Sequence, residues 1–117
     1  MENFEKNVIA DVAVETVNLT RATFEEAGIL KKILDNDIEQ GFQKIIIDLT
    51  QCEFIDSTFI GVLVVTLKEI AKIGGEIRII KPTSNANTIL TQSGTLDYFN
   101  VVGSVEDGVK SFRSEEI

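Results

Sequence analysis

A short apolar run at residues 45–49 constrains the fold of this chain more than any other feature. It contains three consecutive isoleucines and a leucine, is too short for a helix, and is typical of a strand buried on both faces. A few polar residues later, Asp56 and Ser57 directly precede a long apolar segment with helical spacing. We therefore expect a central strand and then a helix, capped by Asp56 or Ser57, with one serine hydroxyl at its exposed start.

The N-terminal part of the chain predicts a strand pair followed by a helix. Short apolar and β-branched segments favour strands at residues 4–9 and 12–17, which we expect to pair with one another. Thr23 and Glu26 form a capping-box pattern, in which each side chain accepts a hydrogen bond from a free backbone N–H. A helix is therefore expected from this point to about Gln40.

The C-terminal part continues the alternation. A strand at residues 76–80 follows the glycine pair that ends the second helix, and a strand, a helix and a strand joined this tightly form a parallel unit. We expect a third helix from Thr83 or Ser84 to about Gly94, an edge strand at 98–102, and a last short helix opened by Ser104. The inward face of that last helix would be Val105, Val109 and Phe112. This alternation predicts an α/β fold.

Length and composition limit the possible functions. The 117 residues are expected to form one domain, residues 1–117, whose core needs no metal and no cofactor. With no histidine and one cysteine, Cys52, neither an intramolecular disulfide nor a Cys/His zinc site can form. A formal charge of −8 argues against nucleic acid as a direct partner. Since a signal peptide and an apolar run of ~20 residues are both absent, we expect no membrane contact and a cytoplasmic protein of bacterial type.

The helix after Ser57 is apolar on more than one side. Projected at about 100° per residue, it has a predicted core face made of Ile60, Leu63, Val64, Leu67, Ile70 and Ala71. Val62 and Val65 fall on the opposite side, in company with Thr58 and Gly61. A small apolar strip beside an exposed serine suits a reversible interface. The predicted contact residues on this helix are therefore Ser57, Thr58, Gly61, Val62 and Val65.

The segment from Phe54 to Leu63, Phe-Ile-Asp-Ser-Thr-Phe-Ile-Gly-Val-Leu, resembles the most specific motif of the STAS family of anti-sigma-factor antagonists. The resemblance extends over nearly the whole chain. It implies a small mixed, mainly parallel sheet of four to five strands, with about four helices packed mostly on one face. It also implies that Ser57 is phosphorylated by an anti-sigma factor that is itself a serine kinase. In this scheme the unphosphorylated form binds the kinase and frees a sigma factor for transcription, and a serine phosphatase resets the switch.

Phosphorylation at a helix start is physically compatible with the fold. The free N–H groups and the positive end of the helix dipole favour a phosphate there. The effect would fall on the surface, because a dianion beside Asp56 and Glu53 repels an acidic or apolar partner.

Two residues depart from the family pattern. Phe59 stands where the family usually has glycine, and its ring would either crowd an approaching kinase loop or add an apolar anchor to it. Asn18 replaces an aspartate that the resemblance places near the serine. Together with Asp56, both are included among the predicted partner-binding residues. Phe59 and Asn18 also favour an alternative function, a STAS scaffold or sensor module that is not switched by phosphorylation at Ser57.

A catalytic function is not expected. Without histidine, a Ser-His-Asp triad cannot be built on Ser57, and no lysine lies close in sequence to act as the base. The chain also lacks a glycine-rich phosphate-binding loop.

Overall fold

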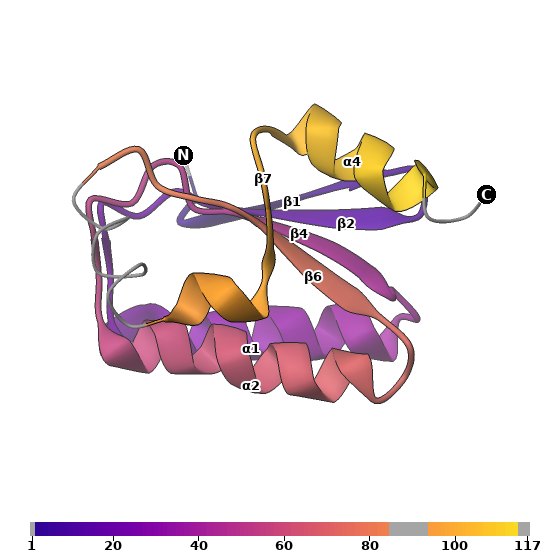
Figure 1. Ribbon diagram of the computed structural model, residues 1–117. Coiled ribbons are helices and arrows are strands. Elements are labelled where there is room, and N and C mark those ends of the chain that lie inside the picture. The colour runs from indigo at the N-terminus through magenta and orange to yellow at the C-terminus, as the bar shows by residue number, and fades with distance from the viewer. Residues whose placement is uncertain (1, 85–93, 115–117) are drawn as a thin grey trace.

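Five strands form the central sheet of the computed structural model, which describes residues 2–84 and 94–114 (Figure 1). In spatial order they are β1 (Phe4–Ile9), β2 (Val12–Val17), β4 (Lys44–Asp48), β6 (Glu76–Ile80) and β7 (Asn100–Val102). β1 and β2 are antiparallel, and the other neighbouring strands are parallel. The apolar run that begins at residue 45 therefore lies in the middle strand, as the sequence predicts.

Helices cover both faces of the sheet. Two long helices lie side by side on one face and a shorter one lies on the other (Figure 1): α1 (Phe24–Glu39), α2 (Ser57–Ala71) and α4 (Val105–Ser114). The remaining elements are a 3₁₀ turn and a short parallel strand pair: η1 (Thr95–Tyr98), β3 (Arg21–Ala22) and β5 (Phe54–Ile55). Among the described residues, no helix combines the length and apolar composition that a membrane span needs.

The predicted α/β fold is confirmed, with a mixed, mainly parallel five-stranded sheet. The expected third helix falls mostly on residues 85–93, outside the described part of the chain. The expected edge strand at 98–102 is shorter than predicted. Tyr98 belongs to the 3₁₀ turn, in which the N–H of Asp97 donates to the carbonyl of Gly94 at 3.1 Å.

Alternate residues of β4 face two separate cores. Ile45 and Ile47 pack in the core beneath α1 and α2, whereas Ile46 packs in the smaller core beneath α4. All three side chains are fully buried. This is the physical reason for an uninterrupted apolar run, because neither face of the strand meets water.

A buried arginine joins α4 to the sheet. Arg78 of β6 is 2% exposed, and its guanidinium group lies over the Phe112 ring, 3.9 Å from the centroid. It also donates to the Ser111 hydroxyl and forms an ion pair with Glu76, with Nη2 2.7 Å from Oε2. The predicted inward face of α4 is confirmed, since the smaller core includes Val109 and Phe112 with Val105 packed against it.

A second buried polar cluster lies between α1 and the β1–β2 hairpin, and the sequence does not predict it. Glu15 of β2 and Asp37 of α1 are each only 1% exposed, and Lys6 of β1 is 2.7 Å from Asp37 Oδ1. Burial is the main cause that raises the pKa of Glu15 to about 9, and the hydrogen bond and negative charge of Asp37 raise the pKa further. Glu15 therefore keeps its proton at neutral pH.

This pKa predicts that stability decreases as pH rises. The pKa of Glu15 is about 9 in the folded protein against an ordinary value of 4.5, so its stabilising contribution is complete below the lower value and is lost toward the higher one. Over this interval the free energy of unfolding should fall by up to about 1.4 kcal/mol per pH unit. Urea denaturation at a series of pH values measures the slope. Glu15→Gln cannot titrate and should lack this decrease; equal slopes in both proteins would mean that Glu15 is ionised when folded.

Candidate functional site

The segment between β4 and α2 brings the starts of α1 and α2 together. β5 pairs with β3, which stands just before α1, so that Ile55 lies opposite Ala22. The N–H groups of Glu53 and Phe54 also donate to the carbonyl of Thr20, at 2.8 and 3.0 Å. The sequence does not predict these short strands, because two residues carry no periodic pattern.

Asp56 caps both helices with one carboxylate. Its Oδ1 accepts a hydrogen bond from the N–H of Phe59 at 2.9 Å, which is the expected N-cap of α2. Its Oδ2 accepts from the N–H of Phe24, the first residue of α1, at 2.8 Å. The backbone N–H of Asp56 donates to the carbonyl of Ala22 at 3.0 Å. The sequence predicts the first cap, but the second depends on a contact between residues far apart in the chain.

Ser57 is the first residue of α2 and is exposed, as is Thr58. The capping bond of Asp56 fixes the backbone on which the serine stands. The hydroxyl is therefore presented at a defined position and is accessible to another protein.

The structure corrects the prediction for Phe59. Its side chain is 0% exposed and belongs to the core beneath α1 and α2, so it neither crowds nor anchors a kinase loop at the surface. The reason is helical spacing, because Phe59, Leu63 and Ile70 lie along the inward side of α2. The buried face of α2 comprises Phe59, Ile60, Leu63, Thr66 and Ile70. Ala71, predicted to be in the core, is exposed.

The outward face of α2 is apolar over a narrower strip than predicted. Val65 is 46% exposed. Val62 and Gly61 are half-buried, and Val62 packs against the core. Val65 is therefore the main apolar side chain that α2 exposes.

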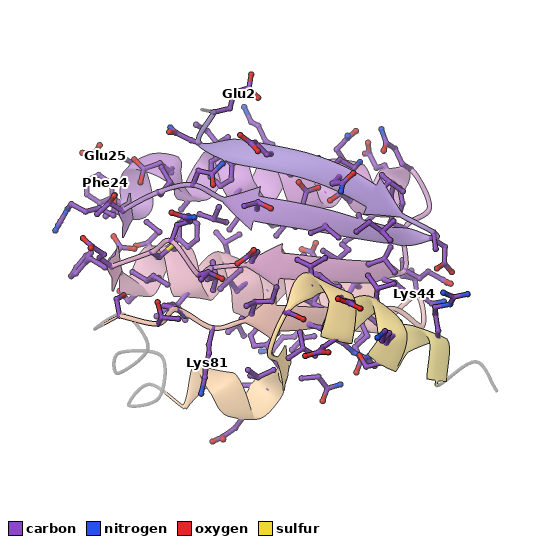
Figure 2. All side chains as sticks on the ribbon, turned by 90° about the horizontal axis from the view of Figure 1, so that it is seen from above. Glu2, Phe24, Glu25, Lys44 and Lys81 are labelled. Carbon is purple, nitrogen blue, oxygen red and sulfur yellow. The ribbon has the colours of Figure 1, made fainter. Side chains whose placement is uncertain are left out.

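Phe24 is an exposed aromatic residue that the predicted contact residues do not include. Its side chain is 67% exposed, and its backbone N–H is held by Asp56, the residue before Ser57. Figure 2 shows Phe24 and Glu25 at one end of the molecule, and Lys44 toward the opposite end. The sequence does contain a sign of this exposure, because Phe24 occupies the first position of a capped helix, where polar residues are usual.

Asn18 follows β2 and anchors the N-terminal segment. Its side-chain amide donates to the carbonyl of Glu2 at 3.0 Å, and its backbone N–H donates to the carbonyl of Asn3 at 2.8 Å. Its expected place near Ser57 stays a prediction.

Cys52 is fully buried. Burial raises the pKa of its thiol to about 12, so the reactive thiolate is not populated at neutral pH.

Sequence comparison shows the family of the chain and relatives that resemble it. The family model of the STAS domain matches residues 19–108. A candidate anti-sigma factor antagonist homologue from Thermotoga neapolitana is 29% identical over 89 residues, which cover 75% of this chain and 78% of the relative. A candidate anti-sigma factor antagonist from Thermotoga maritima is 25% identical over 111 residues, which cover 94% and 97%.

Solved structures agree with this relationship. A crystal structure of a candidate anti-sigma factor antagonist from Thermotoga maritima is 25% identical, aligns with a TM-score of 0.85 and covers 94% of each chain. The anti-sigma factor antagonist SpoIIAA aligns in its unphosphorylated form with a TM-score of 0.72 at 16% identity, over 97% of this chain and 99% of its own. Bacillus SpoIIAA in the phosphorylated form gives the same TM-score at 15% identity, over 93% and 98%. The SpoIIAA likeness shows the fold alone.

The double cap predicts graded losses of stability at Asp56. Asp56→Ala removes both of these hydrogen bonds, while Thr23 remains the N-cap of α1, and should lower the free energy of unfolding by about 2–3 kcal/mol, roughly twice the effect of one such bond. Asp56→Asn keeps an oxygen for α2 but offers an N–H₂ group to the N–H of Phe24, so its loss should be intermediate. Ser104→Ala, which removes the single cap that Ser104 Oγ provides to the N–H of Asp107, is the matched control for one cap. Urea denaturation measures all three; equal losses for the alanine variants would show that the α1 cap contributes nothing.

Proposed function

Because this chain belongs to the STAS domain family, we propose that it is an anti-sigma factor antagonist, a non-catalytic protein-interaction module controlled by phosphorylation of Ser57. In the unphosphorylated state it binds an anti-sigma factor that is a serine kinase, and a sigma factor is freed. A serine phosphatase restores this state.

The observation that carries the proposal is the position of Ser57. An exposed hydroxyl at the first residue of α2, on a backbone fixed by Asp56, is accessible to a kinase without local unfolding. The similarity to candidate anti-sigma factor antagonists supports the partner class.

A phosphate on Ser57 would act through surface charge. The exposed carboxylates of Glu53 and Glu25 belong to the same end of the molecule, at the approach to α2 and in the first turn of α1. A dianion added beside Asp56 would repel an acidic partner surface. It would also oppose an apolar contact, because the hydrated phosphate would have to lose water there. The fold itself need not change, since both forms of SpoIIAA align equally well with this chain.

We infer that the partner contacts the start of α1 and the outward surface of the first three turns of α2. This docking surface consists of Phe24, Ser57, Thr58, Gly61, Val62 and Val65. It combines one exposed aromatic ring with small apolar groups, a composition common at interface centres. Beyond it, an ion pair between Lys31 of α1 and Glu69 of α2, with Nζ 3.1 Å from Oε2, makes the surface charged.

Intact-mass spectrometry tests the switch. The protein is incubated with ATP and each anti-sigma-type serine kinase from its own genome, and one kinase should add a single phosphate. Ser57→Ala should remain unmodified. Thr58→Ala, which removes the neighbouring exposed hydroxyl, is the matched control and should be modified like the wild type.

Modification that persists in Ser57→Ala would contradict the assignment of the serine. If no kinase modifies the protein while one of them still binds it, the phosphorylation model fails, and an unswitched STAS scaffold or sensor becomes the better account.

Binding measurements test the docking surface. Val65→Glu places a charge in an apolar contact and should weaken binding of the unphosphorylated protein to its kinase by at least about tenfold, or 1.4 kcal/mol. Phe24→Ala should also weaken binding, because it removes the exposed ring. Ile73→Glu is the matched control, since Ile73 is 44% exposed just beyond the other end of α2. Isothermal titration calorimetry with all three variants gives the comparison, and equal losses at Val65 and Ile73 would place the interface elsewhere.

A further inference from the structure

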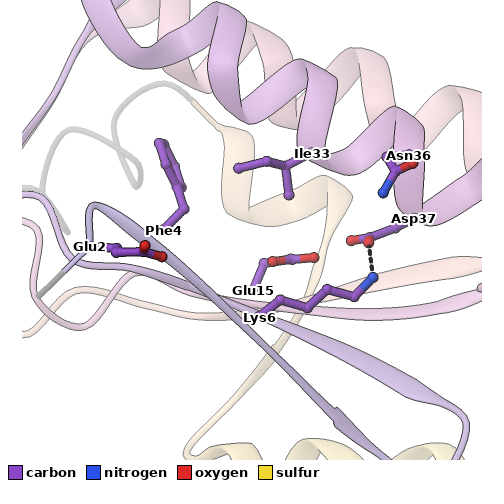
Figure 3. Close-up of a pocket in the computed structure, with 7 residues that line it drawn as sticks. All are labelled: Glu2, Phe4, Lys6, Glu15, Ile33, Asn36 and Asp37. Carbon is purple, nitrogen blue, oxygen red and sulfur yellow. Dashed lines mark ion pairs between the residues drawn. The ribbon is translucent and has the colours of Figure 1, made fainter.

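A cavity of about 280 Å³ lies against the buried polar cluster, between α1 and the β1–β2 hairpin (Figure 3). It is lined by Glu2, Phe4, Lys6, Glu15, Ile33, Asn36 and Asp37. The half-buried side chains of Phe4 and Ile33 supply apolar walls, and Glu2 and Asn36 are exposed. Its volume lies below the roughly 300–1,000 Å³ of pockets for drug-sized molecules, so it suits a smaller ligand.

Two buried carboxyl oxygens of the cavity wall lack hydrogen-bond donors. Oε2 of Glu15 and Oδ2 of Asp37 are inaccessible to solvent and receive no hydrogen bond from an N–H or hydroxyl group of the described residues. Buried oxygens of this kind are costly unless they are paired. Figure 3 shows both side chains extending toward the same space, and a hydrogen bond between the two carboxyl groups is one cause of the raised pKa of Glu15.

Lys6 is the cation beside these carboxyl groups, and its ammonium group already contacts Asp37, Gln40 and Phe42. Its Nζ lies 2.7 Å from Asp37 Oδ1, donates to Oε1 of Gln40 at 3.0 Å and lies 4.7 Å from the centroid of the Phe42 ring. These three contacts hold the ammonium group on one side of Asp37. Counting Glu2, Glu15 and Asp37 against Lys6, the cavity contains more acidic than basic groups.

We propose that this cavity binds a small alkylguanidinium compound, whose planar cation donates hydrogen bonds to Glu15 and Asp37 while its alkyl chain lies between Phe4 and Ile33. A guanidinium group presents several donors in one plane and is suited to two adjacent carboxylates. A metal ion fits less well, because the described residues contain no group of three or more His, Cys, Asp or Glu side chains that could hold one.

Binding releases a proton. The carboxyl group of Glu15 is protonated at neutral pH and must ionise to accept two hydrogen bonds from a cation. The proton passes to the solvent, and the charge of the bound cation compensates the carboxylate that remains. Affinity should therefore rise by about tenfold per pH unit while the pH stays below the pKa of Glu15.

The test uses ethylguanidinium as the probe and neutral ethylurea, which has a similar shape, as its partner. Two-dimensional NMR of the full chain should show saturable shifts at Ile33, Asn36 and Asp37 with ethylguanidinium and none with ethylurea. Calorimetry in buffers of different ionisation enthalpy should show release of one proton per cation bound at neutral pH.

Variants identify the carboxyl group. Glu15→Gln preserves the shape of the side chain and should weaken binding at least tenfold, whereas Glu39→Gln, the same change at an exposed position of α1, should not. Asn36→Arg places a tethered cation at the exposed rim and should also abolish binding, and it leaves the buried pair intact. The proposal would be overturned if ethylurea bound as well as ethylguanidinium, or if the affinity did not depend on pH. It would also be overturned if neither Glu15→Gln nor Asn36→Arg weakened binding, or if the cavity bound Ca²⁺ and not ethylguanidinium.

Discussion

The carboxylate of Asp56 is the interaction on which the arrangement of the candidate site depends. By accepting from the N–H groups of Phe59 and Phe24, it joins the starts of two helices that are separated by the whole length of α1 and β4. Helix starts leave several N–H groups without partners, and one acidic side chain here satisfies a donor at each of two starts. The exposed serine and the exposed aromatic ring are consequently held at one end of the molecule by a single residue.

Most of the fold could be predicted because its elements carry local signals. The boundaries of β1 and β2 match the prediction, α1 begins at the capping box of Thr23 and Glu26, and α2 begins after Asp56. Apolar periodicity and capping act within a few residues, so sequence reveals them. The pairing of β3 with β5 depends on residues more than thirty positions apart, as Arg21 and Phe54 show, and no local pattern predicts it.

The candidate site was predicted less completely, for reasons of burial. Ser57 and Val65 are exposed as expected, but Phe59 turns inward because α2 is rotated so that Thr66, a polar residue, lies in the core. When the buried face of a helix is predicted from its apolar residues alone, a polar residue on that face shifts the predicted centre away from the true one. The same limit applies to Glu15 and Asp37, since a charged residue gives no sign in sequence that it will be buried beside another.

The parallel alignment of α1 and α2 also sets the local charge at Ser57. Each helix start is equivalent to about half a positive charge, so two adjacent starts supply about one unit, which the single negative charge of Asp56 nearly cancels. The carboxylate of Asp56 alone therefore offsets most of the positive charge of the two helix starts. A phosphate of about −1.5 to −2 on Ser57 would therefore keep most of its net negative charge and add to that of Glu53 and Glu25 at the surface that a partner approaches.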